Sequence, residues 1–321
     1  MAMRAAHVTR VGAAPEPVVL SEPSAGDGEA IIAVTSAALN PVELRVAAGR
    51  MPGASVPYVP GLEGVGTVIR SITLPEGTRV RFENDLPGFG KDGAIREIAV
   101  AEDAALIELP SSVDDTTAAA AGVVGVTAEL AFRLAGMEGG ERVAVLGATG
   151  GVGQIAVQLA AARGAASVVA VGRHRQGLDW LESNGATASV DLTRSSALPE
   201  ALQEAAGGPL DIVVDPLWGA PAMGAIAALG DGGKLVTVGN TAGTDVELPL
   251  QAMRKARSSV IGLSSGWTPL SEKLDAYRFV LGQLSAGTVK MNLHVESLAS
   301  ITEAWALQER FPHTKIVVSL I

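Results

Sequence analysis

The chain has 321 residues, a length at which a single hydrophobic core usually gives way to two. Its formal net charge of -10 at pH 7 argues against a surface that binds nucleic acid. Cysteine is absent, which excludes disulfides, thiolate nucleophiles and cysteine-ligated zinc.

Neither a signal peptide nor a membrane span is predicted. Residues 1–8 lack the apolar stretch of a secretory signal. The most apolar run, residues 118–132, is interrupted by Thr127 and Glu129 and is too short to cross a bilayer. We therefore expect a cytoplasmic protein that contacts neither a membrane nor a nucleic acid, and whose partner is a small molecule.

The first third of the chain has the pattern of short strands. Turn-forming Pro and Gly residues separate its apolar segments. The predicted strands are residues 30–35, 64–69 and 94–100. Such spacing indicates a compact, barrel-like β domain.

The pattern changes after Pro110. An alanine-rich helix is predicted from about Thr116, and valine-rich strands then alternate with helices to about residue 265. The strands are residues 143–146, 167–171, 188–190, 212–214 and 234–238, and the clearest helices are residues 152–163 and 177–183. This alternation predicts a doubly wound α/β domain with a parallel sheet. A helix after Leu270 and a strand at residues 315–320 complete the chain.

A glycine-rich turn at residues 147–153 carries the strongest functional signal. It follows one apolar strand, opens a helix and precedes a second apolar strand. Glycines let the backbone approach a pyrophosphate, and the N–H groups at a helix N-terminus stabilise its charge. We therefore predict a dinucleotide site, against the alternative of a turn without a ligand. The predicted contacts are Ala148, Thr149, Gly150, Gly151 and Val152.

The end of the second strand of this motif predicts which nicotinamide cofactor binds. NAD sites commonly place Asp or Glu there to bind the ribose 2′-hydroxyl. This chain has Gly172 and Arg173 instead, and no carboxylate before Asp179. A guanidinium suits the 2′-phosphate of NADPH, so Gly172 and Arg173 are predicted cofactor residues. The alternative is a basic cluster that only faces solvent.

Motifs along nearly the whole chain support a family resemblance. They are Asn40-Pro41-Val42-Glu43, residues 57–66, Gly125-Val126-Thr127-Ala128, the turn at residues 147–153, residues 231–236 and Lys315-Ile316-Val317. The chain resembles the medium-chain dehydrogenase/reductases, and within them the zinc-free quinone oxidoreductase, or zeta-crystallin-like, branch.

The resemblance implies an α/β fold with two domains. A GroES-like β-barrel domain would comprise residues 1–115 and 286–321, and a Rossmann NADP(H)-binding domain with a doubly wound parallel sheet would comprise residues 116–285. The active site would lie between the domains, and two chains would form a homodimer.

Further cofactor contacts come from the resemblance and from strand position. The resemblance places Thr127 and Lys315 at the cofactor. Gly239 and Asn240 follow the strand at residues 234–238, and sites in parallel sheets lie at the carboxyl ends of strands. The alternatives are a threonine that bonds its own helix and a solvated lysine.

Zinc chemistry is not predicted. Zinc-dependent members of the family would place Cys and His ligands near two positions that hold Asn40 and Leu62 here. Without a metal, an acceptor oxygen that gains charge needs hydrogen-bond donors. The predicted catalytic donors are Asn40, Tyr58 and Arg45. The alternatives are a turn-capping asparagine, a packed tyrosine and a solvent-facing arginine.

The leading hypothesis is an NADPH-dependent oxidoreductase that transfers hydride to a quinone, an enone or a related activated carbonyl without zinc. One alternative is an enoyl-thioester reductase of fatty-acid or polyketide metabolism. Met51 counts against it, because the resemblance implies a tyrosine at this position in such reductases. Another alternative is an NADPH-binding sensor or structural protein with little turnover.

Overall fold

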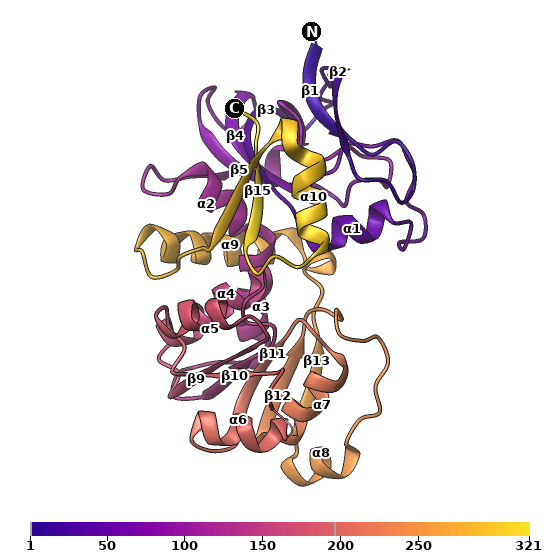
Figure 1. Cartoon of the computed structure of the whole chain (residues 1–321). Helices are drawn as coiled ribbons and strands as arrows, with labels where there is room; N and C mark the ends of the chain where they lie inside the picture. Colours follow the sequence, from indigo (N-terminus) through magenta and orange to yellow (C-terminus); the bar gives the residue numbers. More distant parts are fainter. Residues whose placement is uncertain (1, 196) are drawn as a thin grey trace. The chain divides into compact units, whose positions relative to one another are not determined.

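The computed structural model describes residues 2–195 and 197–321, and it divides into two compact units. The first unit comprises Met1–Val123, Pro269–Leu281 and Met291–Ile321. The second unit comprises Val124–Thr268 and Gly282–Lys290. Figure 1 shows the N- and C-terminal segments of the chain together in the first unit.

The second unit contains a six-stranded parallel sheet within the described residues. Its strands are β8 (Arg142–Val145), β9 (Ser167–Gly172), β10 (Ala188–Asp191), β11 (Leu210–Asp215), β12 (Leu229–Thr237) and β13 (Ser259–Gly262). Their spatial order is β10-β9-β8-β11-β12-β13. The direction of winding reverses between β8 and β11, and this switch point is where such sheets bind ligands.

Helices cover both faces of this sheet. The helices of this part of the chain are α3 (Gly122–Ala135), α4 (Gly151–Ala162), α5 (Arg175–Glu182), α6 (Leu198–Ala206), α7 (Gly219–Ala227) and α8 (Leu250–Ala256). Ala144 of β8 and Val213 of β11 pack in one core cluster with Leu202 of α6 and Ile226 of α7. Their strand neighbours point to the opposite face and are also fully buried, as Val145 illustrates. The predicted doubly wound Rossmann sheet is confirmed.

The first unit is built on a seven-stranded sheet within the described residues. Its order is β14-β15-β3-β4-β5-β7, and β6 also pairs with β3. The strands are β3 (Glu29–Ala38), β4 (Glu63–Arg70), β5 (Arg79–Glu83), β6 (Ile98–Glu102), β7 (Ile107–Glu108), β14 (Leu293–Ser297) and β15 (Lys315–Ser319). All pairs are antiparallel except β14 with β15. This is the predicted GroES-like domain, and the α/β fold class is confirmed.

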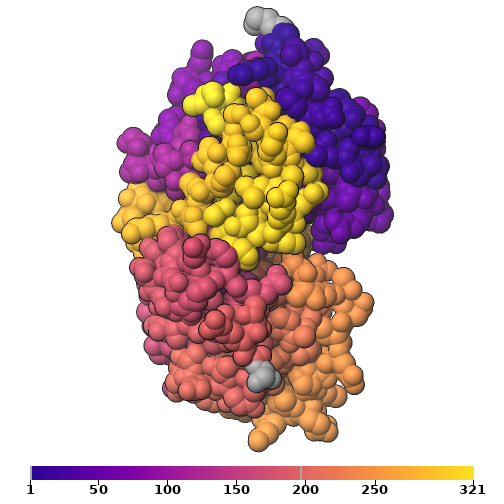
Figure 2. Space-filling model, in the orientation of Figure 1, coloured from indigo at the N-terminus to yellow at the C-terminus, as the bar shows by residue number. Residues whose placement is uncertain are grey.

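The remaining elements of the chain surround this sheet. The strands β1 (Ala2–His7) and β2 (Glu16–Ser21) form a separate antiparallel pair. In the space-filling view, the C-terminal segment forms much of the visible face of the first unit (Figure 2). The helices are α1 (Pro41–Ala47), α2 (Asp115–Ala120), α9 (Leu270–Ser285) and α10 (Ile301–Glu309), and the short 3-10 helices are η1 (Asp103–Ala105), η2 (Ser265–Trp267) and η3 (Leu298–Ser300).

Two details differ from the sequence expectations. The first compact unit extends to Val123 rather than to residue 115, because α2 packs on β3 and β4 of that unit. It also takes in residues 269–281, where the hydroxyl of Tyr277 donates to the carbonyl of Ala118 at 2.8 Å. The strand expected at residues 94–100 begins only at Ile98, because the N–H of Ala94 instead bonds the carbonyl of Gly61 in a loop contact.

Candidate functional site

The glycine-rich turn of the second unit has the geometry of a phosphate cradle. It leads from β8 into α4, whose N-cap is Gly150, and no side chain caps the helix there. The N–H groups of the first turn of α4 therefore face outward without a side-chain acceptor. A Cβ on Gly153 would lie 2.5 Å from the Cα of Ala148, so this position admits only glycine. Gly147 has φ of 56°, which also favours glycine.

The turn is fixed to the carboxyl end of β9. The N–H of Ala148 donates to the carbonyl of Val171 at 2.9 Å. Thr149 is buried, and its methyl group would lie 3.5 Å from a Cβ on Gly172 and 2.7 Å from a Cβ on Gly177. Small residues at both positions let the turn approach the strand end. The predicted contacts at 148–152 and Gly172 therefore lie in one place.

Arg173 is the guanidinium at this strand end that remains unengaged. It is exposed, and the part of the chain that the structure describes offers it no hydrogen bond or ion pair. Arg175, two residues later, binds the carboxylates of Asp179 and Glu182, with a 2.7 Å contact from Nε to Asp179. Two carboxylates that follow this strand end, Asp179 and Glu182, are therefore engaged by Arg175.

The switch point lies beside the same turn. A Cβ on Gly147 would lie 3.0 Å from the side chain of Leu217, which follows β11. A Cβ on Gly239, after β12, would lie 2.7 Å from the carbonyl oxygen of Pro216. The predicted residues Gly239 and Asn240 are thus on the strand-end edge that carries the turn, and Asn240 is exposed.

Two buried polar side chains complete the description of the second unit. Asp215 ends β11, and its Oδ1 accepts the N–H groups of Leu217 and Trp218 at 2.8 and 2.9 Å. Burial raises the pKa of this carboxyl above its ordinary value. Thr127 on α3 is also buried, and its Oγ1 donates to the hydroxyl of Ser265 at 3.2 Å. The hydrogen bond between Thr127 and Ser265 does not test the predicted contact of Thr127 with the cofactor.

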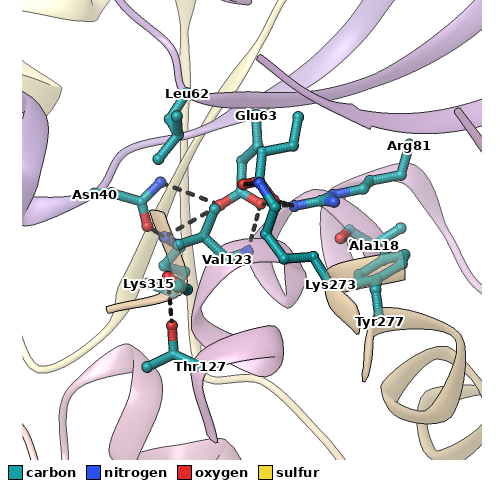
Figure 3. A network of polar contacts seen from close by, with 12 residues as sticks. Asn40, Leu62, Glu63, Arg81, Ala118, Val123, Thr127, Lys273, Tyr277 and Lys315 are labelled. Atoms are coloured by element: carbon teal, nitrogen blue, oxygen red, sulfur yellow. Dashed lines mark hydrogen bonds and ion pairs between the residues drawn. The ribbon is translucent and has the colours of Figure 1, made fainter. Parts of the chain in front are cut away.

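The first unit contains a buried polar network centred on Glu63 (Figure 3). The Oε2 of Glu63 accepts the guanidinium of Arg81 at 3.0 Å and the N–H of Val123 at 2.6 Å. Its Oε1 accepts the amide Nδ2 of Asn40 at 3.1 Å and lies 3.9 Å from the ammonium of Lys315. Glu63 was not predicted as a site residue. A charged residue at the start of an apolar strand was the signal that the sequence offered for it.

The network continues to α9. Arg81 also binds Glu83 at 2.8 Å, and Glu83 accepts the ammonium of Lys273 at 2.8 Å. The guanidinium carbon of Arg81 lies 4.7 Å from the centre of the Tyr277 ring. Contact with Arg81, and then with Lys273, holds the pKa of Glu83 below its ordinary value against the effect of burial.

Glu43 joins the two segments that carry Asn40 and Leu62. One carboxyl oxygen accepts the N–H of Asn40 and the other accepts the N–H of Leu62, both at 2.7 Å. Burial raises the pKa of Glu43 to about 7, although both N–H groups and Lys315 act to lower it. Glu43 occupies the third position of α1, where a glutamate often bonds the N-cap backbone, and this signal was available in the sequence.

The structure separates the three predicted catalytic donors by environment. Asn40 is buried, and its amide faces Glu63 and Lys315. Tyr58 is also buried, its hydroxyl has no hydrogen-bond partner among the described residues, and burial raises its pKa. Arg45 is exposed on α1. The structure thus brings Asn40 together with Lys315, a residue predicted for the cofactor.

The described residues contain neither a metal-binding cluster nor a membrane-spanning helix. In residues 2–195 and 197–321, no group of three or more His, Cys, Asp or Glu side chains is placed to hold a metal ion. Over the same described residues, no helix combines the length and the apolar character that crossing a membrane requires.

Each of the two units matches a known family model. The family model described as alcohol dehydrogenase GroES-like domain matches residues 26–111, and the model described as zinc-binding dehydrogenase matches residues 151–276. A zinc-type alcohol dehydrogenase-like protein of Schizosaccharomyces pombe is 28% identical over 272 residues, which cover 84% of this chain and 80% of that protein. The quinone oxidoreductase of Homo sapiens is 29% identical over 275 residues, with 82% and 80% covered.

Solved structures agree with these relatives. A thermostable alcohol dehydrogenase from Pyrobaculum aerophilum is 28% identical, with a TM-score of 0.85 over 99% of this chain and 100% of that one. Relatives of this kind are oxidoreductases that depend on a pyridine nucleotide. With the sheet order and the glycine-rich turn, these similarities show that the chain belongs to the medium-chain dehydrogenase/reductase family, in its quinone oxidoreductase branch.

Proposed function

We propose that this protein is an NADPH-dependent oxidoreductase that transfers hydride to a quinone, an enone or a related activated carbonyl compound without zinc. The observation that carries the choice of cofactor is Arg173. It follows β9 as an exposed guanidinium with no partner in the described residues, while Arg175 engages the carboxylates of Asp179 and Glu182. An unengaged guanidinium favours a phosphate over a ribose hydroxyl.

The residues of the second unit fit a dinucleotide. The uncapped N-terminus of α4 and the backbone of residues 148–152 would bind the pyrophosphate. Gly172 and Arg173 would bind the adenosine ribose and its phosphate, and Thr127, Gly239 and Asn240 would contact the nicotinamide half. The bound cofactor would supply the hydride.

The chemistry of the first unit supports a reaction without zinc. The positions where zinc-dependent relatives would have ligands hold an amide, Asn40, and an aliphatic side chain, Leu62. The nearby carboxylates of Glu43 and Glu63 are already occupied by backbone and side-chain donors. The amide of Asn40 would instead donate a hydrogen bond to the acceptor oxygen as it gains negative charge. Arg45 and Tyr58 remain proposed donors for the same oxygen.

The test is turnover with a defined set of acceptors. Oxidation of NADPH and of NADH would be followed by the absorbance of the reduced nicotinamide, against several quinones, several enones and one enoyl thioester. We expect turnover with a quinone or an enone, and a higher kcat/KM with NADPH than with NADH. Addition of a chelator should leave the rate unchanged, because no zinc participates.

Three outcomes would contradict the proposal in different ways. Turnover with the enoyl thioester alone would assign the protein to thioester reduction. Tight NADPH binding without turnover of any acceptor would favour a sensor or structural role. A preference for NADH would overturn the role of Arg173. The proposed homodimer is tested separately, by light scattering of the purified protein.

A further inference from the structure

The ammonium of Lys315 faces three oxygens of the first unit. Lys315 begins β15, is almost fully buried, and directs its ammonium into the first unit. The Nζ atom donates to the carbonyl of Leu39 at 2.8 Å and to Oδ1 of Asn40 at 2.6 Å, and it lies 3.9 Å from Oε1 of Glu63. Two of the three ammonium donors are therefore used in hydrogen bonds, and Glu63 is an ion-pair partner beyond hydrogen-bond distance. Both hydrogen bonds tie the ammonium to the segment that carries Asn40.

The partners of the Asn40 amide determine which way the amide faces. An ammonium can only donate, so it requires the amide oxygen, and an ionised carboxylate can only accept, so it requires the amide nitrogen. Lys315 lies at Oδ1 and Glu63 at Nδ2, at 2.6 and 3.1 Å. A flipped amide would place nitrogen against the ammonium and oxygen against the carboxylate. Charge on both sides thus excludes the flipped orientation.

Glu63 is itself immobilised by its surroundings. Its other carboxyl oxygen accepts from Arg81 and from the N–H of Val123, and a Cβ at Gly122 would collide with it. Arg81 in turn is fixed by Glu83 and by the ring of Tyr277. A side chain with several simultaneous partners holds its own partner in one place.

We propose that Lys315 and Glu63 are positioning residues that set the Asn40 amide so that its second N–H donates to the oxygen of the hydride acceptor. One hydrogen on Nδ2 bonds Glu63, and the other has no acceptor among the described residues. Lys315 acts on the reaction through Asn40. This assignment rests on the proposed function, since it takes Asn40 as the donor to the acceptor.

The orientation is measured directly on the asparagine side chains. The chain has five asparagines, so selective 15N-asparagine labelling gives five side-chain amide pairs, and Asn40→Ser identifies the pair of Asn40. We expect Lys315→Met to shift or broaden that pair alone. The matched control is Lys273→Met, which removes another ammonium from the same network but does not touch Asn40. The control should leave the Asn40 pair unchanged.

Kinetics then separate positioning from cofactor binding. With the best acceptor, Lys315→Met should lower kcat roughly tenfold or more, because a misdirected donor stabilises the developing charge poorly. The Kd of NADPH, measured by its fluorescence, should change less than about twofold. Lys315→Arg, which keeps a positive donor, should recover part of kcat.

Several results would overturn the inference. An Asn40 amide pair unchanged in Lys315→Met would do so, as would a Kd of NADPH raised about tenfold or more with kcat preserved. Where Lys315→Met does not fold, Lys315→Gln replaces it, and an unchanged amide pair is again decisive. If the wild-type protein turns over no acceptor, the proposed function fails, while the amide spectra still establish whether Lys315 orients Asn40.

Discussion

The glycine-rich turn of the second unit and the Glu63 network of the first unit differ in how they interact with charge. The turn spans seven consecutive residues, 147–153, and presents backbone N–H groups at a helix end that no side chain caps. The network joins side chains from β4, β5, α9, β15 and the loop before α1, and leaves little of its charge exposed. The turn is left open to bind a charge from outside, whereas the network neutralises charges that the chain itself buries.

Arg81→Met is the substitution that we expect to destabilise the network most. This change removes the cation between two buried carboxylates, Glu63 and Glu83. Breaking a buried ion pair from one side costs about 3–5 kcal/mol, because the remaining charge is uncompensated. We expect a large fall in the free energy of unfolding, measured with urea.

The matched control for Arg81→Met is Arg257→Met. Arg257 also pairs with a carboxylate, Asp231, but both side chains are well exposed. Exposed pairs contribute little, so the urea midpoint should hardly change. An equal effect of the two substitutions would show that the charges around Arg81 are not desolvated as the structure indicates.

Glu43 makes the stability of the first unit depend on pH. Its pKa is raised from 4.5 to about 7 in the folded protein, so between these values the folded state holds a proton that the unfolded state has lost. Stability contributed at this residue is therefore present below pH 4.5 and is lost as pH rises toward 7. The loss corresponds to about 3 kcal/mol.

The measurement compares the wild type with Glu43→Gln across this pH range. The difference in free energy of unfolding, wild type minus variant, should fall as pH rises from 4.5 to 7. Glu200→Gln, at an exposed position, provides the control and should show a flat difference. A flat difference for Glu43→Gln as well would mean that the Glu43 carboxyl is not desolvated.

The same contrast explains what the sequence could predict. The turn, the strand at residues 167–171 and the strand at residues 212–214 were recognisable, because local spacing and apolar runs determine them. The partners of Glu63 could not be read in this way. Arg81 lies 18 residues away and Lys315 contacts Asn40 across 275 residues, so only the sheet order brings them together.

Lys315 is a residue whose burial the sequence did not predict. Its motif suggested contact with the cofactor, but the three oxygens around its ammonium all belong to the first unit. Nothing in the local sequence indicates that the residue is buried, because a lysine that begins a strand is usually solvated. The positioning role proposed for Lys315 rests on these contacts, and its contact with the cofactor stays a prediction.

Gly153→Ala should break the turn without touching the network. The added methyl group would lie 2.5 Å from the backbone of Ala148, which must move. Overpacking costs about 1–3 kcal/mol, so we expect the Kd of NADPH to rise roughly 10- to 100-fold. Gly282→Ala is the control, because a Cβ there meets nothing within 4 Å. Calorimetric titration with NADPH checks both variants, and equal affinities would show that the turn does not bind the cofactor.

The smallest expected effect distinguishes two neighbouring arginines at the edge of the turn. Arg173→Ala should raise the Kd of NADPH about tenfold and leave the Kd of NADH unchanged, because only NADPH carries the 2′-phosphate. Arg175→Ala should change neither value, since Arg175 is engaged with Asp179 and Glu182. Fluorescence titration of both cofactors against the wild type and both variants provides the six Kd values needed. An equal loss of NADPH and NADH affinity in Arg173→Ala would mean that this side chain supports the loop and does not select the phosphate.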